Sequence, residues 1–275
     1  MRYWRTTGMN IYLELTKRFN EGQLRAILAG GQAVVLHRLA IMSKDGDWIL
    51  REEEAALSHI LAVLARYGAR YRFGAPLALR WMSKGWSSHL EFKKDGLRVR
   101  TDFMTRPPRL APADLARMWR ENEHQDIPFA GIRDLIEMKK TNREKDYAVI
   151  GELARRLVSV DDKLLCCRSA RDLLAVVAGE PARAKELSAR RPVLAAAVAG
   201  GGVAELEVAL DAERRALIHG NEQRLGVYER ASGKWFAAWP RISKQIESFD
   251  LPAAHAFLVN EASKMLPTDV EGGLA

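Results

Sequence analysis

The central motif of the chain lies at residues 24–50, which read LRAILAGGQAVVLHRLAIMSKDGDWIL. Its hydrophobic pattern predicts a strand, a helix and a second strand, at residues 24–29, 32–39 and 43–51. Gly30 and Gly31 stand at the junction between the first strand and the helix. A turn without side chains at such a junction lets backbone amides face a phosphate. The motif therefore predicts an α/β unit with an anion-binding turn.

Outside this motif, strands and helices keep alternating up to about residue 158, which indicates an α/β fold. The dipeptide Asp95-Gly96 lies between two alternating runs and predicts a β-hairpin, because Asp-Gly suits a tight turn. The remaining strands are predicted at residues 69–73, 87–93, 96–104 and 127–129. The remaining helices of this half are predicted at residues 9–19, 52–67, 113–123, 132–140 and 143–157.

The C-terminal part of the chain shows no strand pattern. Helices are predicted at residues 170–178, 182–198, 203–219 and 242–248, separated by the glycine triplet 200–202 and by Gly220. We therefore predict two domains. An α/β domain at residues 1–158 is followed by an all-helical domain at residues 159–275.

The composition excludes several classes of protein. The chain has 275 residues, of which 48% are hydrophobic and 28% charged, so collagen-like and wholly disordered chains are excluded. No apolar run reaches about 18 residues, and no membrane span is predicted. Residues 1–5 are not followed by an apolar segment, so no signal peptide is predicted. Cys166 and Cys167 are adjacent and cannot form an ordinary disulfide with each other, which fits a cytoplasmic location.

The basic charge is concentrated in the N-terminal half. Residues 1–160 hold 28 basic and 19 acidic side chains, whereas residues 161–275 hold 15 and 16. Residues 70–109 are the densest part, with 10 basic and 3 acidic side chains. Such a surface suits a polyanionic partner, either a nucleotide or a nucleic acid, although it also serves solubility alone.

Three aspartates are the candidate catalytic and metal-binding residues. Asp45 and Asp47 are two residues apart in a predicted strand, so they project from the same face. Asp102 lies in the second strand of the predicted hairpin, and Arg98 and Arg100 share its face. Carboxylate oxygens are ligands that Mg²⁺ prefers, and three carboxylates suit a two-metal phosphoryl-transfer site. We expect these aspartates to converge.

Two further observations bear on this prediction. An Asp-x-Asp pair is common in solvated loops. The glycine turn upstream and Asp102 downstream are therefore what favours a metal site over a solvated loop. Gly46 is unusual inside a strand, where it costs stability. It indicates either close approach of a nucleotide or a protein that has lost turnover. Motifs typical of kinases, dehydrogenases, serine hydrolases and zinc proteases are absent from the sequence.

The same residues carry a resemblance to a known family. The Gly30–Ala33 turn, the segment Ser43–Leu50 and the strand with Asp102 resemble the nucleotidyltransferase-fold superfamily, particularly AbiE-type toxins and related bacterial nucleotidyltransferases. The block at residues 132–140, followed by Arg-Glu-Lys-Asp at residues 143–146, is similar to a helix that supplies a lysine in that family. The resemblance covers about residues 24–157.

The resemblance implies a mixed sheet flanked by helices and a Mg²⁺-dependent enzyme that moves NMP from an NTP to an RNA, protein or small-molecule acceptor. It implies that Asp45, Asp47 and Asp102 hold two Mg²⁺ ions and are catalytic. It also implies that Gly30, Gly31 and Lys139 bind the nucleotide, and it is compatible with a partner protein, but whether an antitoxin exists does not follow from the sequence. The first alternative is a catalytically weakened module that binds RNA or a partner protein. The second is an unrelated α/β protein whose aspartates lie on the surface.

Overall fold

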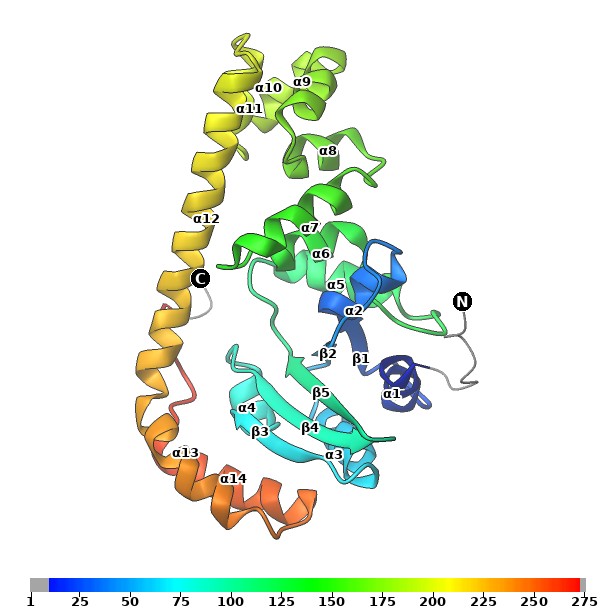
Figure 1. Cartoon of the computed structure of the whole chain (residues 1–275), viewed down its shortest axis with the longest axis vertical. Coiled ribbons are helices and arrows are strands. Elements are labelled where there is room, and N and C mark those ends of the chain that lie inside the picture. The colour runs from blue at the N-terminus through cyan, green and yellow to red at the C-terminus, as the bar shows by residue number, and fades with distance from the viewer. Residues whose placement is uncertain (1–9, 273–275) are drawn as a thin grey trace.

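A computed structural model describes residues 10–272 (Figure 1). The strands are β1 Ala26–Ala29, β2 Asp45–Leu50, β3 Arg70–Gly74, β4 Ser88–Lys94 and β5 Leu97–Met104. The helices up to residue 154 are α1 Ile11–Phe19, α2 Gly30–Leu36, α3 Glu54–Arg66, α4 Leu79–Met82, α5 Pro112–Glu121, α6 Ile132–Lys139 and α7 Glu144–Ala154. The later helices are α8 Val160–Cys166, α9 Ala170–Gly179, α10 Pro181–Leu187, α11 Val193–Val198, α12 Val203–Ala231, α13 Gly233–Gln245 and α14 Leu251–Met265.

The five strands form one mixed sheet in the order β1-β2-β5-β4-β3. β2 and β5 run parallel, whereas the other neighbouring strands are antiparallel. The predicted hairpin is confirmed, since β4 and β5 are joined at Asp95 and Gly96. Both residues have positive φ angles, of 50° and 76°, as the tightest hairpin turns require.

Helices cover both faces of the sheet, which confirms the predicted fold class. Successive residues of β1 alternate between the two faces. Ala26 and Leu28 pack in a core with α1 and α3, whereas Ile27 and Ala29 pack in a second core with α2, α6 and α7. All four residues are buried, so β1 is a central element although it lies at one edge of the sheet.

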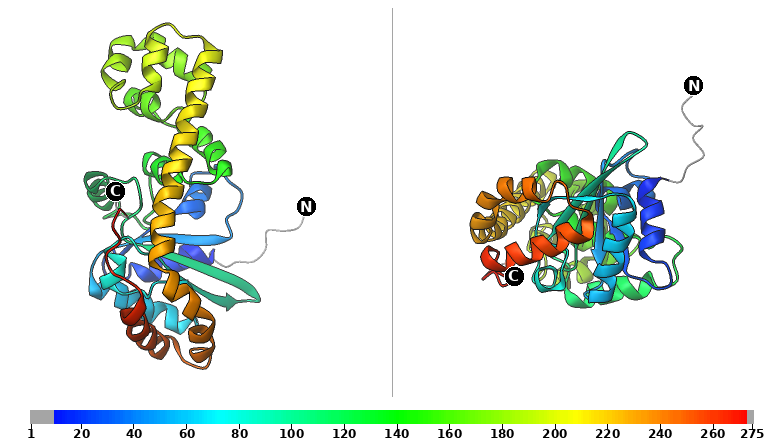
Figure 2. Two further views of the ribbon diagram at one scale, coloured as in Figure 1. Left: turned by 90° about the vertical axis from the view of Figure 1, so that its left-hand side faces the viewer. Right: turned by 90° about the horizontal axis from the view of Figure 1, so that it is seen from below.

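The C-terminal part is entirely helical in the described residues. Helices α8 to α11 and the beginning of α12 share a separate apolar core. The 29-residue helix α12 runs from these helices along the molecule toward the sheet, as Figures 1 and 2 show. Helices α13 and α14 then pack on the α1–α3 face, where Trp235 and Leu258 join the first core. No helix within residues 10–272 is long and apolar enough to cross a membrane. The domain boundary at residue 158 stays a prediction.

Several predicted elements differ from the structure. Helix α12 passes through Gly220 and continues to Ala231, because its own backbone hydrogen bonds tolerate an isolated glycine at a modest cost. The helix predicted at residues 182–198 is interrupted before Pro192, which has no amide hydrogen to donate. The strand predicted at residues 127–129 is a single bridge between Leu28 and Phe129. Helices α8 and α14 were not predicted, and Met9 lies outside the described residues.

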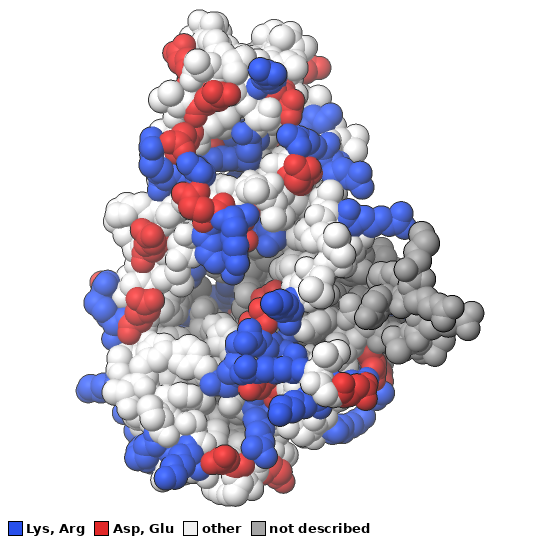
Figure 3. Space-filling view, viewed as in Figure 1, with Lys and Arg blue, Asp and Glu red and all other residues white. Residues whose placement is uncertain are grey.

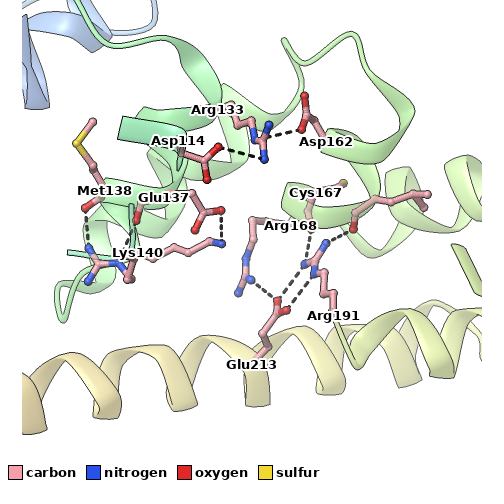
Figure 4. Close-up of polar contacts among 12 residues, drawn as sticks. Asp114, Arg133, Glu137, Met138, Lys140, Asp162, Cys167, Arg168, Arg191 and Glu213 are labelled. Atoms are coloured by element: carbon pink, nitrogen blue, oxygen red, sulfur yellow. Dashed lines mark hydrogen bonds and ion pairs between the residues drawn. The ribbon is translucent and has the colours of Figure 1, made fainter. Parts of the chain in front are cut away.

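An ion cluster fixes α12 to the helices beside it (Figure 4). Glu213 of α12 accepts hydrogen bonds from Arg191, at 2.9 Å through both Nε and Nη2, and from Arg168. Arg191 is only 4% exposed and also donates to the carbonyl groups of Leu164 and Cys167, both at 2.7 Å. Burial raises the pKa of Glu213, but the two arginines outweigh burial and the pKa is lowered.

Replacing Glu213 with glutamine is expected to destabilise the protein by about 2–4 kcal/mol, because a buried arginine would lose its countercharge. The free energy of unfolding, measured by urea denaturation at pH 7, checks this prediction. Glu207→Gln is the matched control, since Glu207 is an exposed glutamate of the same helix. Equal stability of the two variants would contradict a structural role for the cluster.

Candidate active site

The parallel pairing of β2 and β5 brings two of the predicted aspartates side by side. Asp47 is the register partner of Asp102, and Asp45 is the register partner of Arg100. Because Asp45 and Asp47 are two residues apart, they project from one face of the sheet. Helices α2 and α6 cover this face of the sheet. Ile49 and Met104, the next register pair on the same face, belong to the core that these helices form with the sheet.

The glycine turn lets Asp47 lie against the backbone. Gly30 has a φ of +56°, and a Cβ at this position would lie 1.9 Å from Asp47 Oδ2. A Cβ on Gly31 would lie 2.3 Å from Ser43 Oγ. The backbone amide of Gly31 faces Asp47 and offsets a small part of the rise in the pKa of its carboxyl that burial causes. Both glycines are therefore required by the close approach of β2. Their contact with a nucleotide stays a prediction.

Core packing explains Gly46. This differs from the two explanations that its position in the strand suggested, namely close approach of a nucleotide and loss of turnover. A Cβ on Gly46 would lie 2.4–2.6 Å from ring atoms of Tyr12 and Trp48. Tyr12 also donates its hydroxyl hydrogen to the carbonyl of Lys44 at 2.6 Å. Gly46 thus faces the apolar core, on the opposite side of β2 from the aspartates. Packing of two aromatic rings explains this glycine.

Asp102 is held as an anion by two neighbouring side chains. Its Oδ1 accepts from Arg72 Nη2 at 2.7 Å and lies 2.8 Å from His89 Nδ1. His89 Nε2 in turn lies 3.1 Å from Ser87 Oγ. Burial raises the pKa of Asp102, but the hydrogen bond and charge of His89 and those of Arg72 outweigh burial, so the pKa is lowered.

The pKa of Asp47 is shifted in the opposite direction to that of Asp102. Burial, followed by the charge of Asp102, raises the pKa of Asp47 to about 6, against a smaller lowering by Lys139. Neighbouring carboxylates whose pKa values are pushed apart are typical of functional sites. Among residues 10–272, Lys139 forms only a long ion pair with Asp146, at 3.6 Å. Its charge is therefore available to a ligand beside Asp47.

A cavity of about 410 Å³ opens beside Asp47. Four of the six predicted site residues line it, namely Gly30, Gly31, Asp47 and Lys139. Basic side chains from other elements line the same cavity, namely Arg109, Arg143 and Arg224. Figure 3 shows the hollowed surface beside α12, with Lys and Arg above and below it. Asp45 and Asp102 do not line this cavity.

Two of the three aspartates suit a metal ion only in part. No three acidic, histidine or cysteine side chains gather into a metal-binding set within residues 10–272. Asp45 lies 3.5 Å from Arg100, and one oxygen of Asp102 is already shared by Arg72 and His89. Mg²⁺ commonly binds one or two carboxylates and completes its shell with water and substrate phosphates. The residues therefore fit an ion whose remaining ligands come from the substrate.

Sequence reasoning missed four residues around this site: Arg72, His89, Arg109 and Arg224. The position of His89 could have been predicted from the hairpin, because a two-residue turn at Asp95 and Gly96 places His89 opposite Asp102. Arg72 reaches Asp102 from β3, where it is the extra residue at a register shift between Tyr71 and Phe73 that no sequence pattern signals. Arg109 and Arg224 are far apart in the sequence, and only tertiary packing brings them to the same cavity.

Comparison with known proteins gives limited similarity. No protein-family model and no curated protein sequence matches the chain. A crystal structure from H. pylori, provisionally described as a nucleotidyltransferase, is similar at 14% identity and a TM-score of 0.39, over 78% of this chain and 96% of that one. The crystal structure of JHP933 from Helicobacter pylori is similar at 13% identity and a TM-score of 0.38, over 78% and 92%. Similarity at this level identifies no substrate and no site residue here.

Asp47→Asn is expected to raise the free energy of unfolding by about 3 kcal/mol at pH 7 in a chelating buffer. Ionised Asp47 destabilises the folded protein, because burial and Asp102 raise its pKa from 3.8 to about 6. This cost is absent below pH ~4, grows as the pH rises to ~6 and is constant above that. Urea denaturation between pH 4 and 7.5 checks the prediction.

Asp95→Asn serves as the control, because Asp95 is an exposed aspartate in the hairpin turn. Its stability should follow that of the wild type across the pH range. An Asp47→Asn protein that is less stable than the wild type at pH 7 would show that the carboxylate is held by contacts that favour folding.

Proposed function

We propose that this chain is a Mg²⁺-dependent nucleotidyltransferase, which moves an NMP from an NTP to an acceptor and releases pyrophosphate. The observation that carries the proposal is the Asp47–Asp102 register pair, set beside a cavity with Lys139 on its wall. Acidic and basic groups on one cavity suit a substrate that brings both a metal ion and phosphates.

The proposed roles of the residues follow from their contacts. Asp45, Asp47 and Asp102 would hold Mg²⁺, two ions in the arrangement that the resemblance implies, and the metal would supply charge neutralisation and a more acidic acceptor hydroxyl. Lys139 would bind a phosphate oxygen as a point charge. Gly30 and Gly31 would let the nucleotide approach the backbone. His89 and Arg72 would keep Asp102 ionised and oriented.

The acceptor in this proposal is an RNA, a protein or a small molecule. The excess of basic residues at 70–109 favours RNA, although several of these arginines have acidic neighbours. Arg98 pairs with Glu91 at 2.6 Å and Arg106 with Glu52 at 2.6 Å. As a finer assignment we propose a toxin-type enzyme of the AbiE kind. It would act in the cytoplasm with a partner protein of the antitoxin kind.

A second function is favoured by one observation. One oxygen of Asp102 is bound by both Arg72 and His89, which leaves its other oxygen as the free ligand. A catalytically weakened nucleotidyltransferase-like module that binds RNA or a partner protein would show this arrangement. Such a module would bind NTP or RNA without transferring label.

Incubation with each α-³²P-labelled NTP, Mg²⁺ and total cellular RNA and protein tests the proposal. We expect Mg²⁺-dependent label on a macromolecule or a small molecule, and a loss on the order of 10²-fold or more in Asp102→Asn. Asp95→Asn is the control with the same change on the same hairpin. Binding of NTP without any transfer would favour the binding module instead. Full transfer by Asp102→Asn would contradict the role given to Asp102.

A further inference from the structure

Two arginines on the wall of the 410 Å³ cavity have no acidic partner. Arg109 lies in the loop between β5 and α5, and Arg224 lies on α12. Both guanidinium groups are half-buried, and neither forms an ion pair with an acidic side chain in the described part of the chain. By contrast, the half-buried Arg168 and the buried Arg191 are both paired with Glu213. Arg109 and Arg224 thus place two cations without an ion-pair partner among the described residues on the wall of one cavity.

The Arg109 side chain is held in place by neutral groups. Its Nε and Nη2 donate to the carbonyl oxygens of Glu137 and Met138, at 3.0 and 2.9 Å, and Nη1 donates to Asn221. Asn221 in turn donates to the carbonyl of Lys140 at 2.6 Å. Arg109 also has a φ of +66°, a strained conformation for a residue with a side chain. The guanidinium is thus fixed in position without an ion pair to an acidic side chain in the described part of the chain.

Arg224 is one helical turn beyond Asn221, so it lies on the same side of α12. Its Nε is buried and has no hydrogen-bond partner among residues 10–272. Burial and then the charge of Arg224 lower the pKa of Arg109 to about 10. The charge of Arg224 therefore disfavours the charged form of Arg109. A partly buried like-charge pair destabilises the protein until an anion binds.

We infer that Arg109 and Arg224 form a polyphosphate subsite, which takes the two phosphates that leave as pyrophosphate. The identification of the ligand as an NTP rests on the proposed function, whereas binding of a polyphosphate does not. Arginine binds phosphate oxygens through two parallel hydrogen bonds, which gives both affinity and orientation. Lys139 lines the same cavity, on the side of Asp47.

The geometry gives the ligand a direction. Asp47 and the glycine turn come from β2 and the β1–α2 junction, whereas Arg109 comes from the loop after β5 and Arg224 from α12. A polyphosphate bound by the arginines would bring its remaining phosphate toward Asp47. The ligand would thus join the long helix to the sheet.

The test uses the full chain and inorganic tripolyphosphate, in Mg²⁺-free buffer at constant ionic strength. The wild type should bind tripolyphosphate in a calorimetric titration and unfold at a higher temperature with it. Arg224→Gln should lose at least tenfold in affinity, and without ligand it should unfold at a higher temperature than the wild type. Arg224→Lys keeps the charge and should retain a measurable part of the affinity.

Arg230→Gln is the matched control, because Arg230 is an exposed arginine of the same helix. It should bind tripolyphosphate within twofold of the wild type. The subsite is overturned if the wild type does not bind tripolyphosphate, or if Arg224→Gln binds it as tightly as Arg230→Gln. If Arg224→Gln does not fold, the subsite is judged on Arg109→Gln, which must show the same loss of affinity.

The subsite and the proposed function fail separately. Tight tripolyphosphate binding that depends on Arg224, without transfer of nucleotide label, would support the subsite and contradict the enzyme. Transfer of label with unchanged tripolyphosphate affinity in Arg224→Gln would support the enzyme and contradict the subsite.

Discussion

The carboxylate of Asp47 occupies the space where a side chain on residue 30 would have to be. The 1.9 Å between a Cβ at Gly30 and Asp47 Oδ2 leaves glycine as the residue that fits, and its φ of +56° agrees. This contact fixes the β1–α2 turn against β2. It also holds Asp47 in a half-buried position, where burial and the charge of its neighbour Asp102 raise its pKa. The electrostatics of the cavity depend on this one close approach.

Like charges lie next to each other at two places around the cavity. Asp102 is kept ionised by Arg72 and His89, so Asp47 beside it ionises less readily. Across the cavity, Arg109 and Arg224 repel each other in the same way. Both like-charge pairs weaken the folded protein, and a ligand that carries a cation and an anion would relieve both. Stability is supplied elsewhere, by the two cores of the sheet and by the Glu213 cluster that fixes α12.

Much of the sheet could be predicted from the sequence, because a period of two assigns each residue of a strand to a face. The alternation in β1, the hairpin at Asp95 and the common face of Asp45 and Asp47 all follow from that rule. The parallel pairing of β2 with β5 makes Asp47 and Asp102 neighbours, and local patterns do not encode it. The role of Gly46 was missed because it depends on two aromatic rings. Arg224 was missed because α12 passes through Gly220, where the predicted helix ended.

The most direct measurement is the position of Mn²⁺ in crystals grown with a non-hydrolysable NTP analogue, located from its anomalous scattering. Mn²⁺ substitutes for Mg²⁺ at oxygen-ligand sites. We expect a Mn²⁺ peak in contact with Asp47 and Asp102 and with phosphate oxygens of the analogue, whose remaining phosphates lie toward Arg109 and Arg224. A nucleotide and metal bound elsewhere on the molecule, or no binding at saturating concentrations, would contradict an active site at Asp47 and Asp102.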